Sequence, residues 1–190
     1  MNITEAKKIL DDTFRFTVGD TDNVIQQLKL PKDAKILDVG TGGGNLAITL
    51  ALSGYRVLTG EPAHDDTIYA KQAWHENAKK VGVNHLIEFE AFDAKDMPFE
   101  DDTFDAIFFF GSFHHIEEDS RVKALQECVR TMKAHAIVCL FEPNQNCIKI
   151  IMELDPSHPE AADPNDHAGG LDLESQTIEG TMFDAFIFKK

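Results

Sequence analysis

Short apolar runs alternate with amphipathic stretches along most of the chain. Runs of five to seven residues predict buried strands, at 35–39, 56–60, 86–92, 104–110 and 136–141. Helical patterns lie after the first, second and fourth of these runs, giving the order βαβαββαβ. Because strands that alternate with helices form parallel sheets covered by helices, the pattern predicts a doubly wound α/β fold. A last apolar run at 182–189 predicts a buried final strand.

The helical patterns differ in clarity. Residues 4–30 have amphipathic spacing that is interrupted near Gly19, which predicts two short helices before the sheet, placed to cap a site. Residues 45–53 are apolar on all sides and predict a buried helix that ends at Gly54. A helix is expected at 67–81, with Asp65 or Asp66 as its N-cap. The helix before the fifth run has an apolar stripe at Val122, Leu125, Val129 and Met132.

The pattern weakens after Glu142. A brief apolar run at 148–152 leads into a segment at 155–170 that is rich in Pro and Gly, which predicts a loop. No Lys or Arg lies between Ile150 and Phe188, against nine carboxylates. Potential metal ligands gather in the loop, but their spacing matches no known metal motif and predicts no metal site: Asp155, His158, Asp163, Asp166 and His167.

Composition narrows the class of protein. The chain has 190 residues, which fits one domain, and 43% of them are hydrophobic, as in an ordinary globular protein. The net charge of -15 argues against nucleic acid as a partner, since its phosphates repel acidic surfaces. The three cysteines show no CxxC spacing and predict buried thiols rather than disulfides or a zinc site. The sequence shows neither a signal peptide nor a membrane span, so a cytoplasmic location without membrane insertion is expected.

A glycine cluster follows the first predicted strand. The run Gly40-Thr41-Gly42-Gly43-Gly44 must turn sharply into the next helix, and such a loop lets a ligand contact the backbone. Glu61 ends the second strand about 20 residues later, where it can accept from both hydroxyls of a ribose. The spacing predicts an adenosine-type ligand. Gly42, Gly44 and Ala47 also fit a dinucleotide-binding loop, so an NAD-dependent oxidoreductase is one alternative.

Four sequence blocks between residues 35 and 142 resemble the class I S-adenosylmethionine-dependent methyltransferases, in the branch that includes quinone-biosynthesis enzymes. They are residues 36–44 (ILDVGTGGG), 57–61, 92–99, and 104–107 with 112–116. The resemblance implies a Rossmann-like, mostly parallel seven-stranded sheet with helices on both faces and an antiparallel last strand. It also implies one domain, with cap helices at 1–30, a cofactor-binding core at 35–142 and a short C-terminal part at 143–190. The chain departs from the family's usual Lys-Pro-Gly-Gly turn at Lys133-Ala134-His135-Ala136, so a different local fold is expected there.

The same resemblance implies S-adenosylmethionine as the cofactor and S-adenosylhomocysteine as its product. The resemblance also implies a role for each position. For the methionine part of the cofactor, the glycine loop faces it, Asp38 orients it, and Gly111 lies beside its ammonium group. For the adenosine part, Glu61 binds the ribose, Asp93 accepts from the adenine amino group, and Ala94 supplies a backbone contact. The cofactor-binding residues implied are Asp38, Gly40, Thr41, Gly42, Gly44, Glu61, Asp93, Ala94 and Gly111.

Methyl transfer from a sulfonium is an in-line displacement that needs alignment and exclusion of water, and no protein nucleophile. For a hydroxyl or acidic carbon acceptor, the candidate general bases are His114, His115 and Glu142. Because neighbouring strand residues point to opposite faces, we expect one histidine to face the pocket and prefer His115. The residues after the fourth strand, Phe109-Phe110-Gly111-Ser112, lack the Asn/Asp-Pro-Pro-Tyr sequence of enzymes that methylate base amino groups.

The sequence therefore favours a methyltransferase that acts on a small molecule. Two alternatives remain open at this stage: a catalytically silent S-adenosylmethionine-binding or regulatory protein, and the NAD-dependent oxidoreductase.

Overall fold

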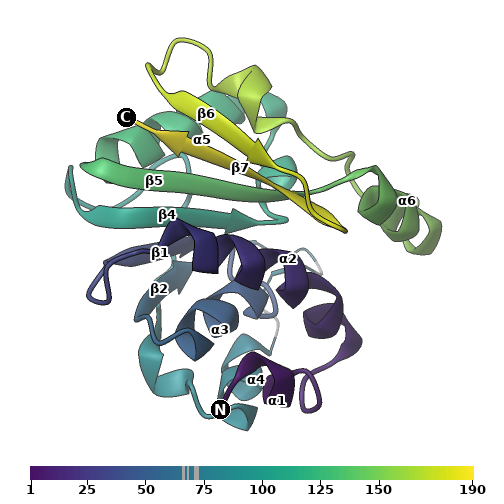
Figure 1. Cartoon of the computed structure of the whole chain (residues 1–190). Coiled ribbons are helices and arrows are strands. Elements are labelled where there is room, and N and C mark those ends of the chain that lie inside the picture. Colours follow the sequence, from purple (N-terminus) through teal and green to yellow (C-terminus); the bar gives the residue numbers. More distant parts are fainter. Residues whose placement is uncertain (66, 68, 71–72) are drawn as a thin grey trace.

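A computed structural model describes residues 1–65, 67, 69–70 and 73–190. In these residues the chain forms a seven-stranded sheet in the order β3-β2-β1-β4-β5-β7-β6 (Figure 1). Strands β1 to β5 pair in parallel, while β7 is antiparallel to both β5 and β6. The doubly wound, mostly parallel fold with an antiparallel last strand is confirmed.

The element bounds are as follows. The strands are β1 (Ile36–Val39), β2 (Val57–Gly60), β3 (Ile87–Phe89), β4 (Phe104–Phe110), β5 (Met132–Pro143), β6 (Glu174–Ile178) and β7 (Phe183–Lys189). The α-helices are α1 (Ile3–Ala6), α2 (Asp12–Leu28), α3 (Asn45–Leu52), α4 (Trp74–Lys80), α5 (Glu118–Thr131) and α6 (Gln145–Leu154). Short 3₁₀ helices are η1 (Asn84–Leu86), η2 (Phe113–His115) and η3 (Pro164–His167).

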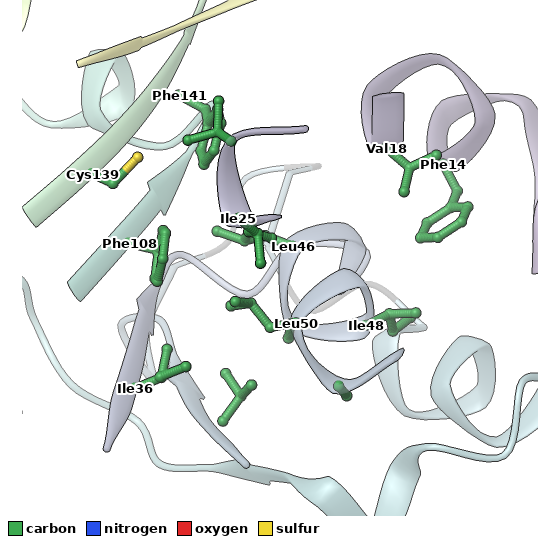
Figure 2. Close-up of a cluster of buried hydrophobic side chains, with 14 of the residues drawn as sticks. Phe14, Val18, Ile25, Ile36, Leu46, Ile48, Leu50, Phe108, Cys139 and Phe141 are labelled. Atoms are coloured by element: carbon green, nitrogen blue, oxygen red, sulfur yellow. The ribbon is translucent and has the colours of Figure 1, made fainter. Parts of the chain in front are cut away.

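The core divides into two layers because successive strand residues point to opposite faces of the sheet. Along β4, Ala106 and Phe108 belong to the cluster shared with α2 and α3, whereas Ile107 and Phe109 belong to the cluster shared with α5. Figure 2 shows the first cluster, in which residues of β1, β4 and β5 face the helices: Phe14, Val18, Ile25, Ile36, Leu46, Ile48, Leu50, Phe108, Cys139 and Phe141. The sheet thus holds its strand ends on a rigid, two-sided core.

The N-terminal prediction was wrong about where the helix breaks. The chain turns after α1, and Asp11 caps α2 by accepting a hydrogen bond from the Phe14 N–H at 3.1 Å. From there α2 continues through Gly19 to Leu28. Gly19 is exposed and contacts nothing that a side chain would displace, so the apolar face of α2, packed on α3, keeps the helix intact despite the glycine.

The helix expected at 67–81 is shorter than predicted. It begins at Trp74 with Ala73 as its N-cap, and Thr67 and Ala70 precede it in turns and bends. The Asp65 side chain accepts from the Thr67 N–H instead of capping a helix. The alternative cap, Asp66, lies outside the described residues, as do residues 68, 71 and 72.

The predicted boundary between α5 and β5 was also wrong. The buried side of α5 consists of Ala124, Leu125, Cys128 and Thr131, whereas Val122 is 39% exposed. Met132 is the first residue of β5, which runs unbroken through residues 133–136 with a register irregularity against β4. The unusual turn sequence is therefore an extension of the strand. Competition between helix and strand at Met132 was decided by pairing with Phe104.

The C-terminal part contains elements that the sequence pattern did not indicate. The apolar run at 148–152 belongs to α6, which Asn144 caps through the Asn146 and Cys147 N–H groups. Strand β6 went unpredicted because its sequence, ESQTI, is mostly polar; it lies at the sheet edge and pairs only with β7. The final strand is confirmed as β7, and Asp20 of α2 accepts N–H bonds from residues 181–183 at its start.

Two further expectations concern the cysteines and membrane insertion. Cys128, Cys139 and Cys147 are free and buried, as predicted. Burial raises the pKa of the Cys147 thiol to about 11 and those of the other two still further, so these thiols are unreactive. Among the described residues, none of the helices combines the length and apolar character needed to span a bilayer.

Candidate functional site

The glycine bend lies where β1 ends, and its geometry explains its composition. Gly40 and Gly42 have φ values of +96° and +47°, a region that side chains disfavour. A Cβ on Gly40 would come within 2.5 Å of the Ser112 Cβ. Ser112 in turn donates to the Val39 carbonyl at 2.6 Å, which draws the start of η2 against the end of β1. The missing side chains thus allow β1 and η2 to approach each other.

Gly44 differs in position from Gly40 and Gly42. It is the N-cap of α3 with φ +80°, and a Cβ there would come within 2.9 Å of the Trp74 Cβ. It does not belong to the residues that line the cleft described below. The structure therefore assigns Gly44 to the packing of α3 against α4, while Gly40 and Gly42 face the cleft.

A buried polar group lies beneath the bend. The Thr59 hydroxyl donates to Asp38 Oδ2 at 2.9 Å and lies 3.0 Å from the Thr41 hydroxyl. Asp38 Oδ1 is buried without a hydrogen-bond partner among the described residues. Burial, which outweighs the Thr59 hydrogen bond and is reinforced by the nearby Glu61 charge, raises the pKa of the Asp38 carboxyl to about 7. An unpaired buried carboxylate oxygen is costly, and a cationic ligand would relieve it.

Two acids from neighbouring strands reach the same cleft. Glu61 follows β2, is buried, and accepts the Gly42 N–H at Oε2 over 3.1 Å. Asp93 follows β3 and accepts the Lys95 N–H over 2.9 Å, which holds its carboxylate in a tight turn. The narrow approach of β2 to β3 depends on Gly60, where a Cβ would lie 2.0 Å from the Glu90 carbonyl oxygen. The two acids and the glycine bend therefore share one wall.

These residues line a cleft of about 760 Å³ at the carboxyl ends of the strands, the place where open α/β sheets bind ligands. Its volume falls within the range of small-molecule sites. Of the predicted cofactor-binding residues the cleft brings together all but Gly44: Asp38, Gly40, Thr41, Gly42, Glu61, Asp93, Ala94 and Gly111.

The predicted catalytic residues meet in the same region of the fold. His114 and His115 both line the cleft, and Glu142, near the end of β5, lies behind His114. His114 Nδ1 is 2.7 Å from Glu142 Oε2, and both side chains are buried. Two Arg121 bonds, to the carbonyls of His114 and Ile116, hold η2 in place.

The expectation that only one histidine faces the cleft was wrong. It assumed that residues 114 and 115 continue a strand, but β4 ends at Phe110 and both histidines lie in η2. A tight 3₁₀ turn does not alternate sides as a strand does. His115 is exposed as a residue, but its ring packs on neighbouring rings, and this partial burial, with His114 and His158 adding to the effect, lowers the pKa of His115 to about 4. His115 is therefore neutral at physiological pH.

Sequence reasoning missed part of this region. Tyr69 packs its ring 4.7 Å from that of His115, and its hydroxyl donates to Asp155 at 2.5 Å. His158, from the loop after α6, places its ring 5.1 Å from His114 and 5.0 Å from His115. The loop's metal-type residues were noticed in the sequence, but nothing there connected His158 with η2.

The other loop residues that were considered with His158 make separate contacts. Asp163 caps η3 by accepting the Asn165 N–H, and the His167 ring packs 5.8 Å from Phe113. Asp155 accepts from Ser157 as well as from Tyr69. They do not converge with His158 on one point.

The sheet order and a cleft that joins a glycine bend to acids at strand ends define a Rossmann-like α/β protein of the nucleotide-binding type. Residues 37–140 match the methyltransferase domain family. The chain belongs to this family, and the resemblance to class I S-adenosylmethionine-dependent methyltransferases is confirmed. The family implies S-adenosylmethionine as the methyl-donating cosubstrate.

Several curated proteins are similar over this core. The 27-O-demethylrifamycin SV methyltransferase of Amycolatopsis mediterranei is 26% identical over 60% of this chain and 40% of its own length. The demethylmenaquinone methyltransferase of Clavibacter sepedonicus is 28% identical over 56% of this chain and 41% of its own length. The chain thus matches less than half the length of these relatives.

Solved structures agree with the fold along nearly the whole chain. A protein of Pyrococcus horikoshii OT3 superposes with a TM-score of 0.71 at 17% identity, covering 95% of this chain and 92% of its own. An S-adenosylmethionine-dependent methyltransferase of Aquifex aeolicus gives 0.67 at 20% identity, covering 99% and 98%. At such identities the likeness establishes the fold.

Proposed function

We propose that this chain transfers a methyl group from S-adenosylmethionine to a small-molecule acceptor. One observation carries the proposal: the glycine bend with Glu61 and Asp93 occupies one part of the cleft, and the histidines of η2 occupy another part of the same cleft. A donor bound by the first group and an acceptor beside the second would therefore share one cleft. In-line methyl transfer requires donor and acceptor to lie close together.

The part of the cleft formed by the glycine bend, Glu61 and Asp93 offers groups that can bind a nucleoside with a positively charged sulfur. Glu61 and Asp93 offer carboxylate oxygens for ribose hydroxyls and an adenine amino group, and the glycine bend offers backbone without side chains. The orphaned Asp38 oxygen calls for a positive group nearby. When bound, S-adenosylmethionine supplies a methyl group on a positively charged sulfur. We assign its binding to these residues, together with Gly40, Gly42 and Gly111.

The histidine half would receive the acceptor. The Glu142 carboxylate accepts from His114 Nδ1 and orients the ring, so Nε2 is the His114 nitrogen available to the acceptor. His115 is neutral and exposed, and it also offers a lone pair to the cleft. Either ring can take a proton from a hydroxyl or acidic carbon acceptor, but a pKa of about 4 makes His115 a weak base, because a general base works best with a pKa near the operating pH. Glu142 stabilises the imidazolium that would form on His114. These are the roles that we propose for His114, His115 and Glu142.

Charge and relatives favour a small acceptor. The net charge of -15 repels phosphate backbones. The similar proteins bear the names of small acceptors, among them a rifamycin, a menaquinone and glycine. The cleft is of small-molecule size.

Two measurements test the proposal in sequence. Calorimetry with S-adenosylmethionine, S-adenosylhomocysteine and NAD should show binding of the two sulfur ligands, while tight NAD binding without them would support an oxidoreductase. Labelled methyl should then pass from S-adenosylmethionine to a compound in a metabolite extract. A protein that binds the sulfur ligands and labels nothing would be a silent binder.

A further inference from the structure

Three histidines converge beside the cleft. His114 and His115 lie in η2, and His158 comes from the loop after α6. Each can offer a ring nitrogen, and the three nitrogens lie within 4.8 Å of one another. Mutually close imidazoles without a carboxylate between them are the donor set of borderline divalent metals.

The hydrogen bonds of two of these rings fix which nitrogen is free. His158 Nδ1 lies 2.8 Å from the Pro159 carbonyl oxygen, which can only accept, so Nδ1 carries the proton and Nε2 keeps its lone pair. His114 Nδ1 donates in the same way to Glu142 Oε2 at 2.7 Å. Metal-binding histidines have this arrangement, in which the second N–H donates to a carbonyl or carboxylate and orients the ring.

His114 provides an independent sign of an absent partner. The residue is 4% exposed, and its Nε2 has no hydrogen-bond partner among the described residues. Burying a polar nitrogen without a partner is unfavourable. A cation at the centre of the three rings would satisfy it. His115 is the exposed member of the group and leaves a route from solvent.

We propose that His114, His115 and His158 bind one divalent metal ion of the zinc type. Three imidazole nitrogens with one open position is the pattern of a catalytic zinc site. Nitrogens bound tetrahedrally to zinc at about 2.0–2.1 Å lie about 3.4 Å apart, so closing the group on the ion requires shifts of about 1 Å. The loop sequence alone predicted no metal, because two of the ligands lie outside that loop.

The position of this site gives it a use that rests on the proposed function. Two of the three ligands, His114 and His115, line the cleft, so the metal would lie beside it with its open position available to an acceptor hydroxyl. With the metal bound, His114 and His115 are ligands and no longer general bases. Coordination instead lowers the pKa of a bound hydroxyl, whose proton then passes to water. The oxygen's electron pair forms the new bond to the methyl carbon as the carbon–sulfur bond breaks, leaving neutral S-adenosylhomocysteine.

Metal binding is measured directly on the full chain. The protein is stripped with a chelator, and Zn²⁺ is titrated by calorimetry, with Co²⁺ as a spectroscopic probe of nitrogen coordination. The wild type should bind one ion per chain. His158→Ala should weaken binding about 100-fold or more, and Glu142→Gln, which keeps all three ligands, about 10- to 100-fold. His135→Ala, which removes an exposed histidine of β5 away from the group, is the matched control and should change nothing.

S-adenosylmethionine binding by each stripped variant separates the possible failures and also reports folding. If the ligand binds but Zn²⁺ does not, or if His158→Ala binds Zn²⁺ as the wild type does, the metal site is overturned and the methyltransferase proposal stands. If Zn²⁺ binds at the three histidines but S-adenosylmethionine does not, the proposed function fails and the metal site stands.

Discussion

The two ends of the cleft are built in different ways. The glycine-bend end draws on strand termini of one parallel sheet, with Gly40 and Gly42 after β1, Glu61 after β2 and Asp93 after β3. At the histidine end, the cleft is lined by a 3₁₀ turn after β4, and residues from the end of β5 and from the loop beyond α6 pack beside that turn. The first is positioned by the sheet itself, whereas the second is positioned by side-chain contacts between segments.

This difference separates a general part from a particular part of the molecule. Strand ends of a parallel sheet meet at one edge in any protein of this fold, so the ligand that they hold can be shared across a family. Contacts such as Tyr69 with Asp155 or His158 with η2 depend on individual side chains. We therefore expect changes at the first end to alter stability and cofactor binding, and changes at the second to alter the chemistry.

The largest effect is expected from Asp38→Asn. Because the pKa of Asp38 is raised from 3.8 to about 7, the folded protein binds the proton more tightly than the unfolded chain. This contribution to stability is complete below about pH 4 and is lost as pH rises to about 7. Asparagine does not titrate, so the variant's free energy of unfolding relative to wild type should rise across that range by up to about 4 kcal/mol. Urea unfolding at pH 4 and pH 8 measures it.

Asp105→Asn provides a control of opposite sign. Partial burial tends to raise the pKa of Asp105, but hydrogen bonds from Lys133 and Lys35 lower it overall. The ionised Asp105 carboxylate stabilises the fold at neutral pH, and this stabilisation is lost on acidification. The free energy of unfolding of the variant should therefore be lower than that of the wild type at pH 7 and approach the wild-type value in acid. An Asp38→Asn effect that does not depend on pH would contradict the burial argument.

The next largest effect is expected from Gly60→Ala. A methyl group there would meet the Glu90 carbonyl oxygen and the Phe92 ring, forcing β2 and β3 apart. Overpacking of this kind costs about 3 kcal/mol, which chemical denaturation should detect. Gly19→Ala, in the exposed middle of α2, should instead stabilise the protein by about 0.5–1 kcal/mol. Equal effects of the two variants would show that Gly60 is not a tight contact.

A smaller effect is expected from Glu61→Gln. The amide keeps an oxygen that can accept the Gly42 N–H but loses the charge that strengthens bonds to ribose hydroxyls. A charge-assisted bond is worth about 1.5–3 kcal/mol, so calorimetry should show S-adenosylmethionine affinity reduced about 10- to 100-fold. Glu88→Gln, on the exposed side of β3, should bind normally. Unchanged affinity in Glu61→Gln would remove Glu61 from the ribose site.

The smallest effect is expected at the histidine end, from Asp155→Asn. Burial, followed by the hydrogen bond and charge of Asp155, raises the pKa of the Tyr69 hydroxyl to about 12. Removing that charge should lower this pKa by about one unit or less, because the burial contribution remains. Ultraviolet titration of tyrosinate in the variant and wild type measures the change. Asp163→Asn, in the same loop, should leave the titration unaltered.

Much of the fold could be predicted because its signals are local. Strand runs, the glycine bend and the acid after β2 each occupy a few consecutive residues, and hydrophobic period alone identifies buried strands. Errors arose where local and tertiary preferences compete: α2 tolerates Gly19 because its face is buried, and Met132 joins β5 because Phe104 pairs with it. Strand β6 has no apolar signal, since only its edge pairing with β7 makes it a strand.

The parallel core, the glycine bend and the acids assigned to the cofactor could be found from residue patterns alone, because they depend on backbone conformation and strand period. That both His114 and His115 line the cleft, and that His158 packs beside them, became visible only in the folded chain. His158 is far from the other two in sequence, so their meeting depends on how loops close over the sheet, and no pattern within a single segment encodes that contact.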